Sequence, residues 1–255
     1  MIGRMKKNED SYDFSQRLWD SGQRLLIAGQ YMAARRELEA AEQQAWRRRD
    51  AVLLSRIYLP LLEACRQIRQ QASGALIVIA ELDQPSKRFI QPLLDAGQGT
   101  LICSGRTAMQ VCSRLMLIAR QNGLSIETLL LGQTSAETRI YSLGAPHYAA
   151  GLPVLWSRDF SHLIEPASPE KLIVPLPWLG SYQPGNPAHT VARESLLLAW
   201  EALALKEIPE KIESLGLWQQ MDVLRSIRPI DPACEPVVLR LIALAEQISR
   251  RVESC

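Results

Sequence analysis

Apolar and small residues recur at intervals of three and four from residue 13 to about residue 49, a spacing typical of amphipathic helices. Small side chains at Gly22 and Ala34 would allow two antiparallel helices to approach closely. Gly29 can adopt the left-handed conformation that ends a helix, and Tyr31 would then pack over the turn. The pattern therefore predicts a helical hairpin.

The segment after Asp50, "AVLLSRIYLPLLEACRQIRQ", also has helical periodicity, and Pro60 is expected to kink it. One hairpin cannot bury its apolar face alone, so a further helix must cover it. We therefore expect residues 1–72 to form a helical domain, a hairpin with a capping helix.

The pattern changes at Ser73-Gly74, where short apolar runs begin to alternate with helical segments. Strands are predicted over residues 75–82, 99–105 and 125–132, helices over residues 85–96 and 106–123, and further candidate strands over residues 138–144 and 152–157. Strands that alternate with helices through short connections favour a parallel sheet. The expected fold class is therefore α/β, a small mainly parallel sheet flanked by helices, over residues 73–165.

Proline is frequent between residues 166 and 188, which predicts a linker and not a core element. Helical patterns follow over residues 190–207 and 209–227, and residues 236–252 form an amphipathic pattern. We expect the C-terminal helices, residues 189–255, to pack on the α/β domain.

The predicted hairpin resembles a single tetratricopeptide repeat, because its small residues, glycine, Tyr31 and alanines follow the spacing of that family over about 34 residues. Leu38 stands where the family usually has an aromatic residue, and the closing proline near Trp46 is missing. The resemblance implies a helix pair that binds a protein partner.

Composition suggests an ordinary globular protein, with 47% apolar residues, 22% charged residues and a net charge of +2. The N-terminus has no apolar segment of a signal peptide, so we expect a cytoplasmic protein without a membrane span. The five cysteines are odd in number and include no Cys-x-x-Cys pair, which argues against a disulfide framework and a zinc site. The sequence indicates no metal and no cofactor.

The first 72 residues hold 13 Lys/Arg against 9 Asp/Glu, and part of this excess is the run Arg47, Arg48 and Arg49. This run could contact an acidic protein or a nucleic-acid phosphate. It could equally be a solvated helix end, where cations complement the helix dipole. Nucleic-acid binding is disfavoured because no interleaved aromatic residues or known reading motif accompany the arginines.

The turn Ser104, Gly105, Arg106 and Thr107 follows a predicted strand and precedes a helix, where free backbone amides accept anions. Its hydroxyl and guanidinium groups could complete a phosphate cradle, although the same residue types also cap helices. Residues 93–123 are similar to the opening strand, turn and helix of sugar isomerase (SIS) phosphosugar-binding domains. That resemblance implies a phosphorylated small-molecule ligand, for which Glu81, Glu127 or His147 would be a convergent polar group. The turn holds one glycine, and no second Ser/Thr-rich loop is evident downstream.

Catalytic signatures such as Gly-x-Ser-x-Gly, a Walker loop and His-Glu-x-x-His are absent from the sequence. Trp178 and Tyr182 could form an aromatic surface near the proline-rich stretch. Two functions remain open. The favoured one is a non-catalytic interaction or scaffold protein that binds a protein partner through the helical hairpin. The alternative is a phosphosugar-like binding domain, sensor or isomerase-like enzyme that uses residues 104–107.

Overall fold

A computed structural model describes the backbone of residues 2–73, 76–81, 87–104, 107–133, 141–144, 180–182, 197, 201, 204–205, 207–228 and 231–253. Its side chains are described over a smaller set of residues, chiefly 14–72, 90–101, 110–128, 207–228 and 231–252. The chain divides into two compact units. The first combines residues 1–67 with residues 208–228 and 232–255, and the second comprises residues 68–207 and 229–231.

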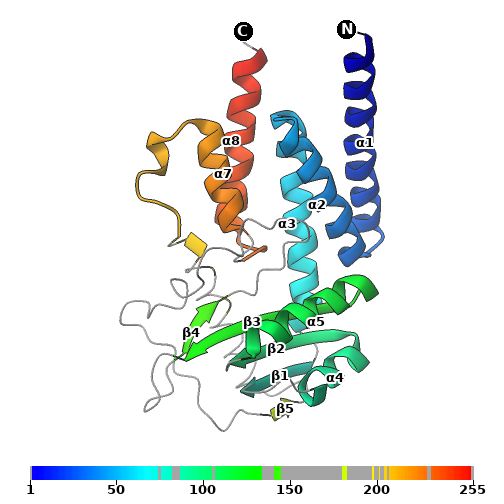
Figure 1. Ribbon diagram of the computed structural model, residues 1–255, viewed down its shortest axis with the longest axis vertical. Helices are drawn as coiled ribbons and strands as arrows, with labels where there is room; N and C mark the ends of the chain where they lie inside the picture. The colour runs from blue at the N-terminus through cyan, green and yellow to red at the C-terminus, as the bar shows by residue number, and fades with distance from the viewer. Residues whose placement is uncertain are drawn as a thin grey trace. The chain divides into compact units, whose positions relative to one another are not determined.

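The first unit begins with the predicted helical hairpin, α1 (Ile2–Ile27) and α2 (Tyr31–Arg47), which run side by side in opposite directions (Figure 1). Gly29 ends α1 with a φ of 73°, and the amide of Gln30 donates to the carbonyl of Leu25 over 2.9 Å. Gly22 faces α2 so closely that a Cβ there would lie 2.6 Å from Cγ of Leu38. The predicted roles of Gly22 and Gly29 are therefore confirmed.

Helix α3 (Ala51–Ser73) contacts Trp19 of α1 and Glu42 of α2, and it continues through Pro60. The Asp50 carboxylate accepts the amide hydrogen of Leu53 over 2.9 Å, which satisfies a free donor in the first turn. Buried apolar residues occupy a wide arc of α3, with Leu54, Ile57, Tyr58 and Leu62 all less than 2% exposed. Such an arc requires neighbours on more than one side of the helix.

Those further neighbours come from the C-terminal part of the chain, the short 3₁₀ helix η3 (Ile212–Ser214), α7 (Leu217–Ile227) and α8 (Glu235–Glu253). All three belong to the first unit. This differs from the expectation that the C-terminal helices pack on the α/β domain. Periodicity shows that a helix has an apolar face, but it does not show which surface that face contacts.

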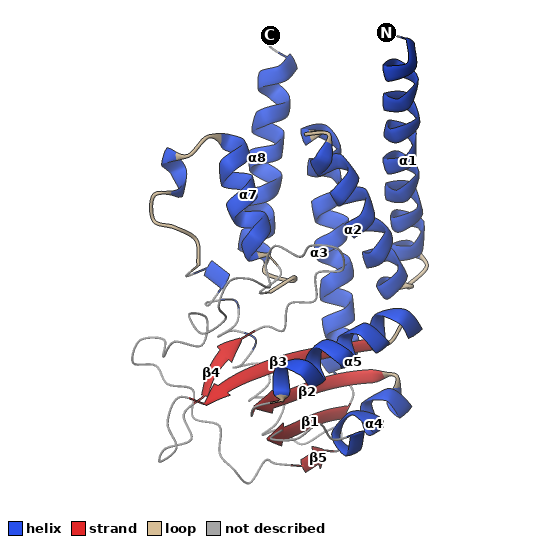
Figure 2. Cartoon of the chain, viewed as in Figure 1, coloured by secondary structure: helices blue, strands red, loops and turns tan. Residues whose placement is uncertain are grey.

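The second unit is built on a five-stranded sheet in the order β4-β3-β2-β1-β5 (Figure 2). Its three central strands, β1 (Leu76–Glu81), β2 (Gln98–Ser104) and β3 (Ser125–Gln133), are parallel and are linked by α4 (Lys87–Ala96) and α5 (Ala108–Asn122). The expectation of a small sheet with helices is confirmed, and its parallel pairing is that of the three central strands.

Helices α4 and α5 share one apolar core with the sheet. The cluster includes Leu93 of α4, Leu101 of β2, Leu115 of α5 and Ile126 of β3, each at most 1% exposed. The strand order continues in one direction from β1 to β3, so right-handed crossovers place both helices on the same face of the sheet.

Both edge strands are antiparallel to their neighbours. Strand β4 (Tyr141–Gly144) lies within the candidate strand of residues 138–144, whereas residues 152–157 lie outside the described part of the chain. Strand β5 (Gly180–Tyr182) pairs with Ile77 to Ile79 of β1. Because β5 comes from the segment predicted as a linker, that prediction is wrong for these three residues. Backbone pairing does not need apolar side chains, which is why the sequence pattern missed it.

No helix among the described residues is long and apolar enough to cross a membrane.

Candidate partner-binding site

The predicted anion turn lies where the sequence placed it along the chain. Strand β2 ends at Ser104, and Thr107 precedes the first residue of α5. The Thr107 side chain does not cap the helix, although its carbonyl accepts the amide hydrogen of Val111. Gly105 and Arg106 lie outside the described residues. The backbone position is thus that of a ligand-binding turn in a parallel sheet, but the described residues do not show a cradle.

Of the two described polar residues considered as partners for this turn, Glu81 lies at the same end of the sheet and Glu127 does not. Glu81 is aligned with Ser104 across β1 and β2. Glu127 is aligned with Thr100, four residues before Ser104 on β2 and therefore about 13 Å from it along the strand. His147 lies outside the described residues.

Glu127 instead belongs to a second polar cluster, which involves the end of α3. Arg69 donates to Glu127 and to Asp231, with each N–O distance 2.7 Å, and Asp231 is fully buried. Burial acts to lower the pKa of Arg69, but the charges of both carboxylates outweigh it and raise the pKa above its ordinary value. Arg69 therefore remains a permanent cation that ties β3 to the segment around Asp231.

The predicted basic run divides among three environments. Arg47 is exposed and makes no ion pair or hydrogen bond through its side chain within the described part of the chain. Arg48 turns toward the hairpin, where it donates to the buried hydroxyl of Ser15 and lies 3.5 Å from the Asp50 carboxylate. Its role is structural, which leaves Arg47 and Arg49 as the surface cations.

Arg49 adopts a left-handed backbone conformation, with a φ of 55°, at the C-terminal end of α2. For a residue with a side chain this conformation costs about 1–2 kcal/mol, and glycine would avoid the cost. The guanidinium lies 5.1 Å from the ring centre of Trp46 and 4.8 Å from that of Trp218, distances at which cations attract aromatic faces. The side chain thus gains contacts that offset the backbone strain.

The two tryptophans come from separate parts of the sequence. Trp46 of α2 and Trp218 of α7 meet edge to face, with ring centres 5.5 Å apart. Asp222, also on α7, lies 3.9 Å from the Arg49 guanidinium, and both side chains are about half exposed. We call Trp46, Arg47, Arg49, Trp218 and Asp222 the arginine–tryptophan surface.

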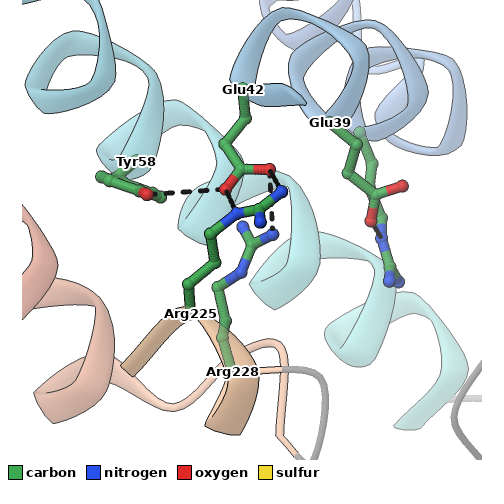
Figure 3. Close-up of polar contacts among 6 residues, drawn as sticks. Glu39, Glu42, Tyr58, Arg225 and Arg228 are labelled. Carbon is green, nitrogen blue, oxygen red and sulfur yellow. Dashed lines mark hydrogen bonds and ion pairs between the residues drawn. The ribbon is translucent and has the colours of Figure 1, made fainter. Parts of the chain in front are cut away.

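A buried carboxylate lies beneath this surface (Figure 3). Glu42 of α2 is 2% exposed, and its Oε1 accepts a hydrogen bond from Nε of Arg225 on α7 over 2.6 Å. Arg228 approaches the other oxygen to 3.6 Å, and Arg225 also lies 4.8 Å from the ring centre of Trp46. A buried carboxylate needs such partners, because an unpaired charge in the interior is strongly unfavourable.

Tyr58 of α3 completes this cluster. Its hydroxyl donates to Oε1 of Glu42 over 3.5 Å, and the Arg228 guanidinium lies 5.9 Å from its ring centre. Burial, reinforced by the negative charge of Glu42, raises the pKa of the Tyr58 hydroxyl well above its ordinary value. Tyr58 is therefore a neutral donor that helps α3 and α7 to hold one carboxylate of α2.

The side chains of the other predicted partner-binding residues lie outside the described part of the chain. Trp178 lies outside the described residues, and Tyr182 is described only as the last residue of β5. No group of three or more histidine, cysteine, aspartate or glutamate side chains arranged to hold a metal occurs among the described residues.

The sequence pattern did not identify five residues of this site, which are Glu42, Trp46, Trp218, Asp222 and Arg225. Glu42 carried a detectable signal, since an acidic residue there falls within the apolar stripe of α2, next to Ala41 and Ala45. A charge on a buried face requires a cation from elsewhere, but the spacing does not identify which one.

No model of a protein family, no curated protein and no solved structure matches this chain.

Proposed function

We propose that this chain is a non-catalytic interaction protein that binds an acidic protein segment through the arginine–tryptophan surface. The observation that carries the proposal is the position of Arg49, a strained cation between Trp46 and Trp218 with half of its side chain exposed. A helix end that served only to terminate α2 would be more stable with glycine there.

The chemistry of this surface suits a protein partner. Tryptophan and arginine provide much of the binding energy in protein interfaces, since they combine large contact area with directed hydrogen bonds. Arg47 is available to pair with a carboxylate, and the contact of Arg49 with Asp222 is long and exposed enough to be exchanged for a carboxylate of the partner.

The hairpin supports the same proposal. We assign α1 and α2 to the tetratricopeptide-like class of helix pairs, on the close approach at Gly22 and the left-handed Gly29. Members of that class present helical surfaces to protein partners. In this chain α7 lies against the hairpin and supplies Trp218 to the surface.

The test compares partner capture by three forms of the full chain. The wild type and an Arg47→Glu/Arg49→Glu variant are used as baits beside a Ser104→Ala/Arg106→Ala variant, which changes the anion turn alone. We expect at least one protein with an acidic segment to be retained by the wild type and the turn variant and lost from the arginine variant. The purified partner should then bind at least tenfold more weakly to the arginine variant.

Two results of this comparison would count against the proposal. One is that every retained protein is kept by the arginine variant, and the other is that capture is lost in the turn variant instead. Thermal unfolding of each bait shows beforehand that the substitutions leave the fold intact.

A second candidate function is the binding of a phosphorylated small molecule at residues 104–107, which the alignment of Glu81 with Ser104 favours. It depends on assigning the second unit to the α/β class, where ligands bind at the carboxyl ends of parallel strands. A thermal-shift screen against sugar phosphates, nucleotides and inorganic phosphate tests it. Stabilisation by one compound that disappears in Arg106→Ala would establish this site, and no shift with any compound would exclude it for those ligand classes.

A further inference from the structure

A different face of the first unit carries an exposed apolar pair. Val52 and Leu59 of α3 are 43% and 56% exposed, and they lie seven residues apart on the same side of the helix. Arg56 and Glu63 share that side, since all four residues follow the three-and-four spacing of one helical face. Contiguous exposed apolar surface is a feature of interaction sites, and this pair would become buried if a partner helix packed on the face.

Neighbouring helices border this face on both sides. On α1, Nε1 of Trp19 donates to the carbonyl of Arg56 over 3.4 Å. On the other side, Arg66 of α3 pairs with Glu235 at the start of α8.

This face carries one positive and one negative side chain, so two copies of it could pair their opposite charges. Arg56 is exposed and its side chain makes no ion pair within the described part of the chain. Glu63 is partly exposed and accepts a hydrogen bond from Gln67 over 2.7 Å, but it has no cation among the described residues. The two residues lie about 10 Å apart along the helix, one on each side of Leu59.

We propose that a second copy of this chain docks on this face, so that two α3 helices pack antiparallel around a two-fold axis beside Leu59. Such an axis exchanges the positions of residues 56 and 63, and Arg56 of each copy meets Glu63 of the other. Leu59 then contacts its own counterpart at the centre. One face therefore supplies both the apolar centre and the two ion pairs, as an isologous interface requires.

This proposal is independent of the arginine–tryptophan surface, because it uses other residues. Sedimentation and light scattering of the full chain test it across a concentration series. We expect a species of twice the chain mass of 28.6 kDa in the wild type. Arg56→Glu and Glu63→Arg should each weaken self-association at least tenfold, because each places like charges opposite one another.

The charge-swapped double variant Arg56→Glu/Glu63→Arg tests whether residue 56 of one copy lies opposite residue 63 of the other. It should restore self-association to within about threefold of the wild type, because the two ion pairs re-form with their signs exchanged. Arg250→Glu on α8, at an exposed position outside this face, is the matched control and should leave self-association unchanged. A wild type that stays monomeric over the whole series, or a double variant as weak as the single ones, would overturn the proposal.

Discussion

Gly22 is constrained by the small space between α1 and α2, and not by its backbone conformation. It lies within the helix α1, where alanine would ordinarily be favoured by about 1 kcal/mol. A Cβ at this position would lie 2.6 Å and 2.8 Å from two carbon atoms of Leu38, which is fully buried and cannot move aside freely. The distance between α1 and α2 thus depends on the missing side chain.

We predict that Gly22→Ala lowers the free energy of unfolding by about 1–3 kcal/mol, the usual cost of an overpacked contact. Ser21→Ala, the adjacent position on α1, is the control and should change it by less than about 0.5 kcal/mol. Adding Leu38→Ala should remove the clash, so that Gly22→Ala costs nothing in that background. A more stable Gly22→Ala variant would show that the two helices are not in close contact there.

Tyr58 is constrained by its burial against Glu42, and the consequence is a dependence of stability on pH. The folded protein keeps the Tyr58 hydroxyl neutral, whereas the unfolded chain ionises it above the ordinary pKa of 10.0. The unfolded state therefore binds fewer protons at high pH, and the stability that neutral Tyr58 contributes is present below pH 10 and lost as the pH rises.

Tyr58→Phe removes this titration. Relative to that variant, the wild type should lose about 1.4 kcal/mol of unfolding free energy between pH 8 and pH 11. Denaturant unfolding of both proteins at pH 8, 9, 10 and 11 measures the difference. If the difference between the two proteins is constant over this range, the Tyr58 hydroxyl titrates normally in the folded state and is not buried as described.

Individual elements were predictable where the local pattern determines them. The hairpin, α3, the three parallel strands and α8 all follow from periodicity and from glycines at turns. Their observed ends lie within a few residues of the predicted ones, except that α1 begins at Ile2, eleven residues before the predicted start at residue 13. Strand β5 was not predictable, because it forms by backbone pairing with β1 inside a proline-rich segment. Packing partners were not predictable either, since the contact of Glu42 with Arg225 joins residues 183 positions apart.

For the candidate site, the sequence identified the basic run of residues 47–49 but not the different surroundings of its three arginines. Arg47, Arg48 and Arg49 are equivalent by composition. The structure separates them, because Arg47 is the last residue of α2, Arg48 follows it with right-handed backbone, and Arg49 adopts the left-handed conformation. The resemblance to a tetratricopeptide hairpin and the similarity to sugar isomerase domains stay predictions.

Substitutions at Gly29, in the turn between α1 and α2, test the prediction that this glycine ends α1 in the left-handed conformation. Gly29 has a φ of 73°, and the nearest atom to a Cβ there is the Tyr31 hydroxyl at 4.0 Å, so space is not limiting. Gly29→Ala should cost about 1–2 kcal/mol through the left-handed backbone alone. Gly29→Asn should cost clearly less, because asparagine tolerates this conformation. Equal unfolding free energies for the two variants would contradict a left-handed turn.

In the whole molecule, the helical first unit is assembled from segments that lie on both sides of the sheet-containing second unit in the sequence. Residues 1–67 supply the hairpin and most of α3, and residues from 208 onwards supply α7 and α8. The proposed binding surface exists only because this assembly brings Trp218 of α7 to Trp46 of α2. The proposed function therefore requires that Glu42 holds α7 on the hairpin.

A double-mutant cycle on the full chain tests whether Glu42 holds α7 on the hairpin. Denaturant unfolding compares Glu42→Gln, Arg225→Met and the double variant with the wild type. Breaking a buried ion pair from either side should cost about 3 kcal/mol, and the double variant should cost little more than one single variant. We therefore predict a coupling free energy above about 1 kcal/mol. Additive effects, within about 0.5 kcal/mol, would show that the two side chains are not in contact and that α7 does not pack on the hairpin as described.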